Sequence, residues 1–414
     1  MFHKTGSGAD MGGNDPTAVD LFCGAGGLSL GFERAGFRVI CAVDNSTAAV
    51  LTYNQNFSCQ ATALDLSLAD LRLPAADVIV GGPPCQGFSS AGMRRPGDPR
   101  NSLVAKFANI VAERRPRAFV FENVEGFLTA HGGAFVLDLL APLLGAGYRI
   151  HLQKVNAANF GVPQHRKRVI AVGGLGFDPS LPRPTHTAFG APGALLASEH
   201  LPLAPAVAEA IRSLPEPACE PPGNPQGHYY RPLRDEDLER AQALGPGQTM
   251  RDLPDALWHT SYRRRAFRRV MDGTPTERRG GAPAGIRRLS GDQPSKAITA
   301  AAKSEFLHPS EHRALTLREC ARLQTFPDQH LFLGRPSDQA GLLGNAVPPL
   351  LAFRFAQTLF HDLEKAEAGV REGALLTFVP TLSDGCSPAL KQVKTLVEKA
   401  FARFVEPREL TLWR

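Results

Sequence analysis

The stretch Asp20-Leu21-Phe22-Cys23-Gly24-Ala25-Gly26-Gly27 decides the fold, because it joins a strand pattern to a helical pattern through a glycine-rich turn. Thr17–Phe22 has the apolar residues of a buried strand, and Gly27–Ala35 has a helical pattern. Small residues in such a turn let a ligand approach the backbone, and the following helix offers free N–H groups to an anion. Asp44 closes the next strand 20 residues after Gly24, where nucleotide-binding folds place an acid for ribose hydroxyls. The spacing is not that of a dinucleotide fingerprint, so the sequence predicts a different cofactor at this turn.

Outward from the turn, short apolar runs alternate with helical patterns up to about residue 175. Strands that alternate with helices in this way predict an α/β domain with a doubly wound, mostly parallel sheet covered on both faces. Further strands are expected at Phe37–Asp44, Asp77–Val80, Ala118–Glu122, Arg149–Val155 and Arg168–Val172, and further helices at Asn45–Asn56, Ser102–Arg114 and Phe135–Leu144.

The alternating pattern breaks near residue 175, where 12 of the 34 prolines fall between Pro179 and Pro232. Proline restricts its own backbone and that of its predecessor, so loops and short helices are expected there. Regular patterns resume near Leu315, and from Ala389 the tail carries one apolar helical stripe, which we expect to pack on the domain. The predicted division is a flexible arm at 1–16, a main domain at 17–174 and 296–388, an inserted small domain at 175–295, and a helical tail at 389–414.

Composition excludes several classes of protein. A hydrophobic fraction of 43% with 21% charged residues is ordinary for a globular chain and excludes disorder throughout. No run of 18 apolar residues and no secretory leader is found, so a bacterial cytoplasmic location, with association to the nucleoid in use, is expected. The seven scattered cysteines include no CxxC pair, which argues against a disulfide framework or structural zinc, and no metal is expected.

Positive charge is concentrated in one segment of the chain. Residues 256–290 hold nine arginines against Asp272 and Glu277, a balance of +7, whereas the whole chain is +6 and the remainder therefore −1. Such a segment is expected to meet phosphates, and double-stranded DNA is the partner it favours. It also fits a solvated helix face, because Arg outnumbers Lys throughout the chain. The residues predicted to contact DNA within it are Arg264, Arg265, Arg268 and Arg269.

A second motif, Gly81-Gly82-Pro83-Pro84-Cys85-Gln86-Gly87-Phe88-Ser89, follows the strand that ends at Val80. Ligands of open α/β sheets bind beyond the carboxyl ends of strands, so Cys85 is expected in the cleft. A thiol aimed by a stiff loop is a candidate nucleophile where its surroundings favour thiolate.

Two further motifs add ionisable groups to the same sheet edge. Glu122 ends another strand, and a partly buried carboxyl there has a raised pKa that suits proton donation. In Gln164-His165-Arg166-Lys167-Arg168, alternation sends Arg166 and Arg168 to one face, as a pair suited to a phosphate or a carbonyl-bearing base.

Together these segments resemble the DNA (cytosine-5)-methyltransferase family of bacterial type. The order DLFCGAGG, GGPPCQGFS, ENV, QHRKR matches, and RALTLRECARLQTFPD from Arg313 and GNAVPP from Gly344 follow the variable region. The resemblance covers about 17–174 and 295–360. It implies a domain that binds S-adenosylmethionine, interrupted by a target-recognition domain, in a sequence-specific enzyme that flips a cytosine out of the duplex.

By this resemblance, Cys85 adds to C6 of cytosine, Glu122 protonates N3, Arg168 orients the base and Arg166 assists. The resemblance also implies two sets of binding residues. Cofactor contacts are expected from Asp20, Phe22, Gly24, Gly26, Gly27, Asp44, Asp65, Pro83 and Asn345, and additional DNA contacts from Gln86 and Ser89. A monomer is expected, either with a separately acting restriction endonuclease as its partner or as an orphan methylase.

Two alternatives stay open at this point. An RNA (tRNA) cytosine-5 methyltransferase shares these motifs, although Gly87-Phe88-Ser89 follows the form of the DNA enzymes. A DNA-binding regulator with degenerate catalysis is disfavoured by intact Cys85, Glu122 and Arg168. Neither the recognition sequence nor the base that removes the C5 proton can be named from these residues.

Overall fold

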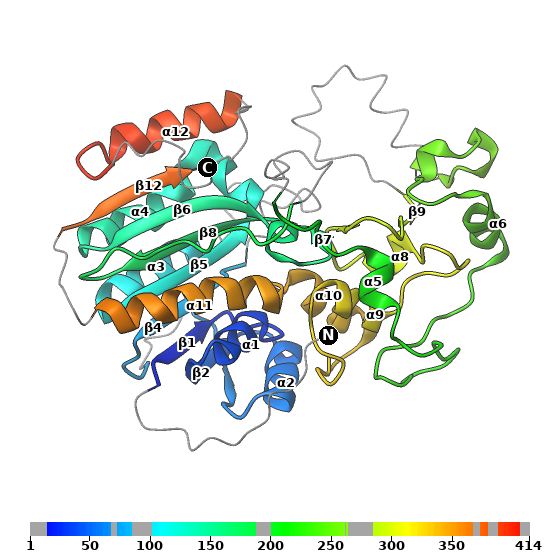
Figure 1. Ribbon diagram of the computed structural model, residues 1–414, viewed down its shortest axis with the longest axis horizontal. Coiled ribbons are helices and arrows are strands. Elements are labelled where there is room, and N and C mark those ends of the chain that lie inside the picture. The colour runs from blue at the N-terminus through cyan, green and yellow to red at the C-terminus, as the bar shows by residue number, and fades with distance from the viewer. Residues whose placement is uncertain are drawn as a thin grey trace.

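The computed structural model describes residues 15–67, 73–84, 102–187, 200–260, 262–263, 285–366, 373–379 and 388–405. Its main feature is an eight-stranded sheet in the order β12-β6-β8-β5-β4-β1-β2-β3 (Figure 1). Neighbouring strands are parallel except at β8, which runs antiparallel to β5 and to β6. The strands are β1 (Thr17–Leu21), β2 (Arg38–Asp44), β3 (Ala61–Ala63), β4 (Val78–Gly81), β5 (Ala118–Val124), β6 (Arg149–Asn156), β8 (Lys167–Gly174) and β12 (Leu375–Val379).

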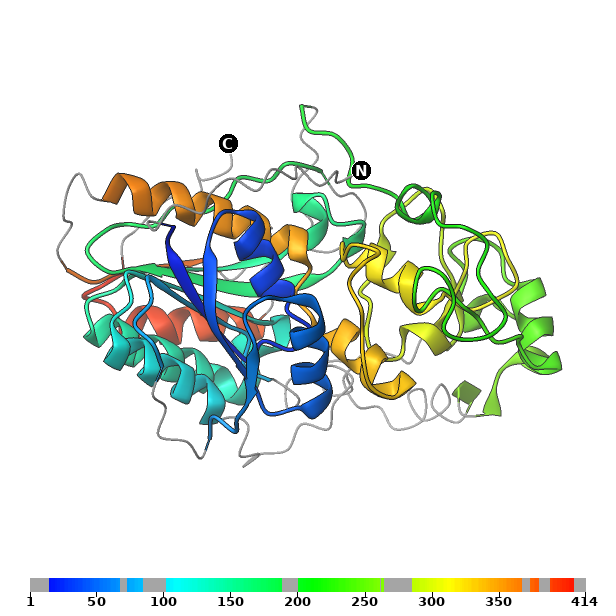
Figure 2. The ribbon, with the colours of Figure 1, turned by 90° about the horizontal axis from the view of Figure 1, so that it is seen from below.

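Helices cover both faces of this sheet (Figure 2). One core joins α1 (Gly27–Arg34) and α11 (Pro349–Lys365) to the sheet. The other joins α3 (Ser102–Arg114), α4 (Ala134–Gly145) and α12 (Pro388–Ala400) to the opposite face. The central strands are buried on both faces and therefore read as continuous apolar runs. The expected α/β class and doubly wound sheet are confirmed, as is every strand and helix predicted before residue 175 to within a few residues.

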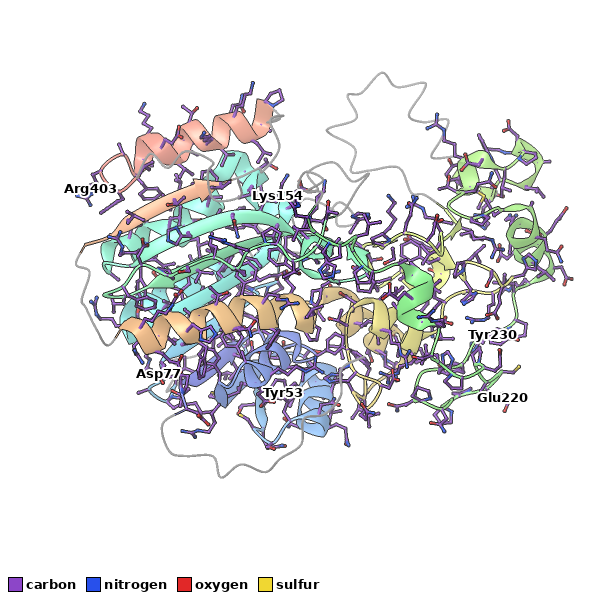
Figure 3. All side chains as sticks on the ribbon, viewed as in Figure 1. Tyr53, Asp77, Lys154, Glu220, Tyr230 and Arg403 are labelled. Atoms are coloured by element: carbon purple, nitrogen blue, oxygen red, sulfur yellow. The ribbon has the colours of Figure 1, made fainter. Side chains whose placement is uncertain are left out.

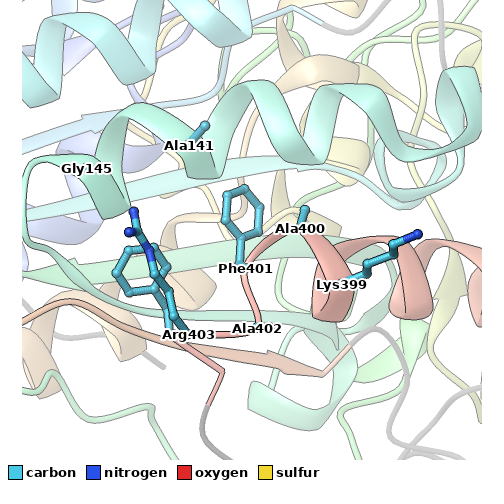
Figure 4. Close-up of a pocket in the computed structure, with 8 residues that line it drawn as sticks. Ala141, Gly145, Lys399, Ala400, Phe401, Ala402 and Arg403 are labelled. Atoms are coloured by element: carbon cyan, nitrogen blue, oxygen red, sulfur yellow. The ribbon is translucent and has the colours of Figure 1, made fainter.

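The C-terminal helix packs as predicted, with Leu390, Val393, Val397 and Phe401 buried against the sheet and α4. A cavity of about 430 Å³ lies where the end of α12 approaches the end of α4 (Figure 4). Its lining runs from Ala141 and Gly145 to Lys399–Phe404. Because α4 ends there before β6 begins, this cavity is at the sheet edge opposite the carboxyl ends of β4 and β5.

The described residues between β8 and α11 lie to one side of the sheet, in loops, short helices and two-residue strands (Figures 1 and 2). β7 (Gln164–His165), just before β8, pairs with β10 (Ser295–Lys296), so the chain that leads into β8 lies beside the chain at the end of the predicted insert. The boundaries of the inserted domain stay a prediction. The remaining elements are α2 (Thr47–Asn56), α5 (Val207–Ile211), α6 (Asp235–Ala243), β9 (Arg287–Arg288), α8 (Ala302–Glu305), β11 (Phe306–Leu307), α9 (Leu317–Leu323) and α10 (Pro336–Asn345), besides short 3-10 turns at 125–128, 130–133, 157–160, 250–252 and 255–257. Among the described helices, none is both long and apolar enough to cross a membrane.

Candidate active site

The predicted site residues that the structure describes gather at one edge of the sheet. β1, β2, β4 and β5 are parallel and end at this edge, and antiparallel β8 begins there with Lys167 and Arg168. The edge therefore brings together the glycine-rich turn, Asp44, Pro83, Glu122 and Arg168 from five separate stretches of chain. This is the edge where ligands bind in open α/β sheets.

Three glycines of the turn after β1 have different surroundings. A Cβ atom on Gly27 would lie 2.1 Å from the carbonyl oxygen of Val347, and one on Gly26 would lie 2.2 Å from Phe57 Cε2. Gly24 has a φ of +54°, and a Cβ there would meet no atom within 4 Å. The turn is thus packed tightly from behind and open at Gly24, which leaves bare backbone for a ligand to approach.

Two carboxylates flank this turn, one at its side and one beneath it. Asp44 Oδ2 accepts the Gly24 N–H at 2.9 Å and its Oδ1 accepts the Ser46 N–H at 2.8 Å. Asp20 is fully buried, and its Oδ2 accepts the Ser29 hydroxyl at 2.6 Å, which in turn accepts the Tyr53 hydroxyl at 2.8 Å (Tyr53 is labelled in Figure 3). Burial raises the pKa of Asp20 to about 7 against the opposing effect of the Ser29 hydrogen bonds. Asp20 therefore supports the turn from below, whereas Asp44 reaches its open side.

The other two predicted cofactor residues with polar side chains are exposed. Asp65 Oδ1 accepts the Ser67 N–H at 2.9 Å and the Ser67 hydroxyl at 2.6 Å, which lowers the pKa of Asp65. Asn345 is exposed at the end of α10, between the buried residues Gly344 and Ala346. Both side chains are accessible to a ligand.

Glu122 and Arg168 form the ionic centre of this edge. Arg168 Nε lies 2.7 Å from Glu122 Oε1, and only 9% of the glutamate side chain is exposed. Burial raises the pKa of Glu122, and the positive charges of Arg168 and Arg166 lower it in part. Burial therefore favours the protonated carboxyl of Glu122, the form that can donate a proton, and the two arginines favour the carboxylate.

The loop that leads to the predicted nucleophile is anchored beside Glu122. A Cβ atom on Gly82 would lie 3.0 Å from Glu122 Oε2, and Asn123 Nδ2 donates to the Pro83 carbonyl at 3.3 Å. The role of Asn123 was missed by the sequence analysis, although its place directly after Glu122 was visible. Cys85, Gln86 and Ser89 lie outside the described residues.

Backbone carbonyls surround the guanidinium of Arg166, and its expected assistance to Arg168 in holding the base stays a prediction. Only 1% of Arg166 is exposed. Its Nη1 donates to the Ile298 carbonyl at 2.8 Å, and its Nη2 donates to the carbonyls of Gly344 at 2.7 Å and Ala346 at 2.9 Å. Alternation predicted its face but could not show that backbone from two distant segments covers it. Arg166 thus fixes the backbone on both sides of Asn345.

A buried glutamine pair extends this support. Gln164 Oε1 accepts the Ile298 N–H at 2.8 Å, and its Nε2 donates to the Leu323 carbonyl at 3.2 Å. Gln324 Nε2 donates to the Leu343 carbonyl at 2.7 Å. These side chains join the chain just before β8 to the backbone at Ile298, at the end of α9 and near the end of α10, and nothing in a single sequence marks them as partners.

The arginine-rich segment is only partly described. Arg264, Arg265, Arg268 and Arg269 lie outside the described residues, so their contact with DNA stays a prediction. Arg288 is one of the nine arginines between residues 256 and 290, but only 3% of it is exposed. Its guanidinium donates to the carbonyls of Ala241, Leu244, His308 and Glu311 and contacts His312 Nδ1. Arg288 therefore binds backbone rather than phosphate, and the surface charge of the segment is smaller than its composition indicated.

Comparison with known proteins agrees with this geometry. The family model of the C-5 cytosine-specific DNA methylases matches residues 17–361. The chain is 33% identical to Type II methyltransferase M.AgeI of Thalassovita gelatinovora, over 82% of this chain and 98% of that protein. It is also 33% identical to Type II methyltransferase M1.HphI of Haemophilus parahaemolyticus, over 83% of this chain and 86% of that protein.

Solved structures show the same fold. A putative DNA modification methyltransferase from an E. coli prophage matches with a TM-score of 0.59 and 24% identity, over 84% of this chain and 99% of that one. The Dnmt2 methyltransferase of S. pombe matches with a TM-score of 0.52 and 16% identity, over 84% and 99% of the two chains. β12 and α12 lie beyond the matched residues of the family model. With five-sixths of its residues matched and its ionic centre at the expected sheet edge, the chain belongs to the C-5 cytosine-specific DNA methylase family.

Proposed function

We propose that this DNA cytosine-5 methyltransferase uses the edge formed by Glu122, Arg168 and the loop after β4 to activate a cytosine. The main support for this proposal is the buried ion pair of Glu122 and Arg168, with 2.7 Å between Arg168 Nε and Glu122 Oε1. The pair lies beside Gly82 and Pro83, where the loop that bears Cys85 begins. C5 of cytosine is a weak nucleophile until a thiolate adds to C6. Cys85 supplies the thiolate, and its sulfur–C6 bond forms as Glu122 delivers a proton to N3. Arg168 holds the carboxyl of Glu122 and orients the carbonyl oxygen of the base.

The step closes with elimination. Once C5 carries the new methyl group, a base takes the C5 proton, the sulfur–C6 bond breaks with Cys85 leaving as thiolate, and N3 returns its proton to Glu122. Because C6 is hidden within a duplex, the nucleotide must leave the base stack to reach this edge. We expect the flipped base to meet the Glu122–Arg168 pair from outside the sheet.

The residues around the glycine-rich turn fit S-adenosylmethionine, which supplies the methyl group as an electrophilic sulfonium. Gly24 leaves the backbone open, and Asp44 lies 2.9 Å from the Gly24 nitrogen with capacity to accept further hydrogen bonds from ribose hydroxyls. Phe22 has a φ of +64°, a strained conformation that such sites maintain for a purpose. We assign the methionine end to Phe22 and Asn345 and the adenine end to Asp65, while Pro83 anchors the catalytic loop nearby.

The partner is double-stranded DNA, read by the segment between β8 and α11. Relatives described as Type II methyltransferases support a place in a restriction–modification system, with a separately acting endonuclease of the same specificity. We expect a monomer acting on the bacterial nucleoid in the cytoplasm.

Bisulfite sequencing of plasmid DNA from cells that express the chain tests the reaction and reads the target sequence. We expect one methylated cytosine within one recurring motif, and no such motif with Cys85→Ser, because a serine hydroxyl is not a comparable nucleophile at neutral pH. Cys320→Ser is the matched control, since Cys320 is buried in α9 among apolar residues. A fluorinated cytosine in the target should trap the wild type covalently and leave Cys85→Ser free. Methylation by the Cys85→Ser protein at more than a few per cent of the wild-type rate would contradict the assignment.

A further inference from the structure

The chain that leads into β8 alternates between buried and accessible side chains, at a place between the large sheet and the insert (Figure 1). Gln164 and Arg166 are buried, and both bind the backbone of Ile298. Because successive side chains of an extended chain point to opposite sides, the partly exposed His165 and Lys167 turn away from that contact.

Two strand pairings place a second lysine on the same side. Lys296 is exposed and lies opposite His165 in the pairing of β7 with β10. Asn156 lies opposite Lys167 in the pairing of β6 with β8, and its Nδ2 is 3.3 Å from His165 Nδ1. Residues that face each other across two strands point to the same side. His165, Lys167 and Lys296 therefore share one accessible surface, which we call the basic face.

The basic face has no acidic partner within the described part of the chain. Neither Lys167 nor Lys296 forms an ion pair with a described carboxylate, whereas Lys154 of β6 pairs with Glu125 at 2.9 Å (Lys154 is labelled in Figure 3). Arg287 of β9 adds to this positive charge, and its buried Nε has no hydrogen-bond partner among the described residues. The positive charge of the basic face is thus uncompensated.

The charged groups that act on the basic face are cations. Although Lys296 reaches the surface, nearby protein atoms displace enough water to lower its pKa, and the positive charges of Arg287 and Lys167 lower it further. Burial lowers the pKa of His165, and Lys296 and Lys167 add to this effect. Like charges held together raise the free energy of the unbound protein, so a bound anion both attracts the lysines and relieves their repulsion.

The basic face begins one residue from the ionic centre. Lys167 directly precedes Arg168, which binds Glu122. When a flipped base meets Glu122, its sugar and phosphates stay outside the edge of the sheet, on the side from which DNA approaches. Phosphates are the groups by which proteins hold the register of a DNA strand, and lysine binds them as a flexible point charge.

We propose that Lys167 and Lys296 bind the backbone phosphates that flank the flipped cytosine. The proposal rests on entry of the base at the Glu122–Arg168 edge, as proposed above. The two lysines hold the target strand in place while the base is out of the stack, and they contribute no sequence preference because every nucleotide carries the same phosphate.

The first experiment counts the phosphate contacts. Lys167→Gln with Lys296→Gln is compared with wild type by fluorescence anisotropy, on duplexes that carry the motif found by bisulfite sequencing. Each lost contact reduces the slope of log K against log salt by about 0.9, so this double variant should lose about 1.8. From about 50 to 200 mM salt, its affinity should therefore fall about tenfold less than that of wild type.

Lys399→Gln with Arg403→Gln is the matched control. It removes the same charge from two exposed positions beside the cavity at the opposite edge of the sheet. The control should keep the wild-type slope. Calorimetric titration with S-adenosylhomocysteine should give the wild-type affinity for both double variants, which shows that the fold is intact and that the basic face does not bind the cofactor.

The second experiment locates the phosphates. A neutral methylphosphonate replaces one phosphate at a time around the target cytosine. Next to that cytosine, the replacement should weaken binding by wild type and by the control about threefold, as expected for one exposed charge pair. It should have no effect on Lys167→Gln with Lys296→Gln, because the contact is already lost, and this cycle isolates the interaction of lysine with phosphate.

The proposal is overturned by a wild-type salt slope in Lys167→Gln with Lys296→Gln, or by an equal loss of slope in the control. Equal methylphosphonate effects in wild type and in this double variant also contradict it, as do effects confined to phosphates distant from the target cytosine. Weaker S-adenosylhomocysteine binding with unchanged DNA binding would assign the lysines to the cofactor instead. A wild type that methylates no motif would refute the proposed function itself.

Discussion

The catalytic edge and the inserted segment are built by different means. At the edge, parallel strands of the sheet end together, and the backbone alone brings Asp44, Glu122 and the loop after β4 into one place. In the insert, short helices and loops are held by buried arginines that donate to backbone carbonyls, as Arg288 and Arg318 do. Side chains thus supply in the insert the order that strand pairing supplies in the sheet. Arginine-rich composition is therefore an ambiguous sign of DNA contact in such a segment.

The largest effect is expected where the edge does its chemistry. Glu122→Gln keeps the shape of the side chain but removes its proton, and it should slow the chemical step by about 10²–10⁴-fold, the usual contribution of general acid catalysis. DNA affinity should hardly change, because Glu122 is buried beside Arg168. Single-turnover methylation with a DNA-binding assay measures both. Glu125→Gln is the control, because Glu125 follows β5 directly and its carboxylate pairs with Lys154 of β6 at 2.9 Å. A Glu122→Gln rate within threefold of wild type would remove Glu122 from the mechanism.

The next effect tests whether arginines hold the insert together. Arg288→Met leaves three buried carbonyls and the half-buried Glu311 carbonyl without their charged donor, and it should lower the free energy of unfolding by about 3 kcal/mol or more. The neighbouring Arg287 is partly exposed, so Arg287→Met should cost less than about 1 kcal/mol. Urea unfolding of the two variants measures the difference. Equal midpoints would mean that Arg288 does not stabilise the insert, and the comparison drawn above would fail.

The sequence predicts the sheet and its catalytic edge well, and it predicts the contacts of the inserted segment poorly. Strands and helices before residue 175 were predicted because hydrophobic periodicity is strong where a sheet is buried on both faces. The positions of Glu122 and Asp44 followed because parallel strands place their carboxyl ends at one edge. β12 was not predicted, since a five-residue strand far along the chain pairs with β6 only through tertiary packing. The roles of Arg166, Gln164 and Arg288 could not be predicted, because each depends on carbonyls that are distant in sequence.

A further effect appears only as pH changes, and it concerns the support beneath the turn. Burial raises the pKa of Asp20 to about 7, whereas in the unfolded chain it titrates near its ordinary value of 3.8. Between those two values the folded protein holds a proton that the unfolded chain has lost, so the contribution of Asp20 to stability falls as pH rises towards 7 and is then constant. Asp20→Asn cannot ionise and should therefore gain about 4 kcal/mol relative to wild type between pH 4 and pH 8.

Urea unfolding of both proteins at several pH values measures this gain. Asp77→Asn is the control, because hydrogen bonds from Thr17 lower the pKa of Asp77 against the effect of its burial, and the difference should therefore have the opposite sign. Parallel pH profiles for wild type and Asp20→Asn would show that Asp20 ionises at its ordinary pKa.

The smallest effect is expected from the arginines between residues 263 and 270, and it tests whether arginines of the insert bind DNA or stabilise the fold. Arg264 and Arg268 are four residues apart, a spacing that places two side chains on one face if the segment is helical. Several cations in a row suit phosphates better than base edges, so Arg264→Ala with Arg268→Ala should weaken cognate and non-cognate duplexes about equally. Each lost phosphate contact should reduce the slope of log K against log salt by about 0.9.

The matched control is Arg234→Ala with Arg251→Ala, which removes the same charge from two exposed positions of the insert. Affinity is measured by fluorescence anisotropy between about 50 and 200 mM salt, where such contacts change binding most. If the control pair flattens the slope as much as the Arg264 and Arg268 pair, the effect is one of net charge and no phosphate is held specifically. Loss confined to the cognate site would make these arginines base readers. Unchanged DNA affinity in the variant with Arg264→Ala and Arg268→Ala would mean that these two arginines stabilise the insert, as Arg288 does, and do not bind DNA.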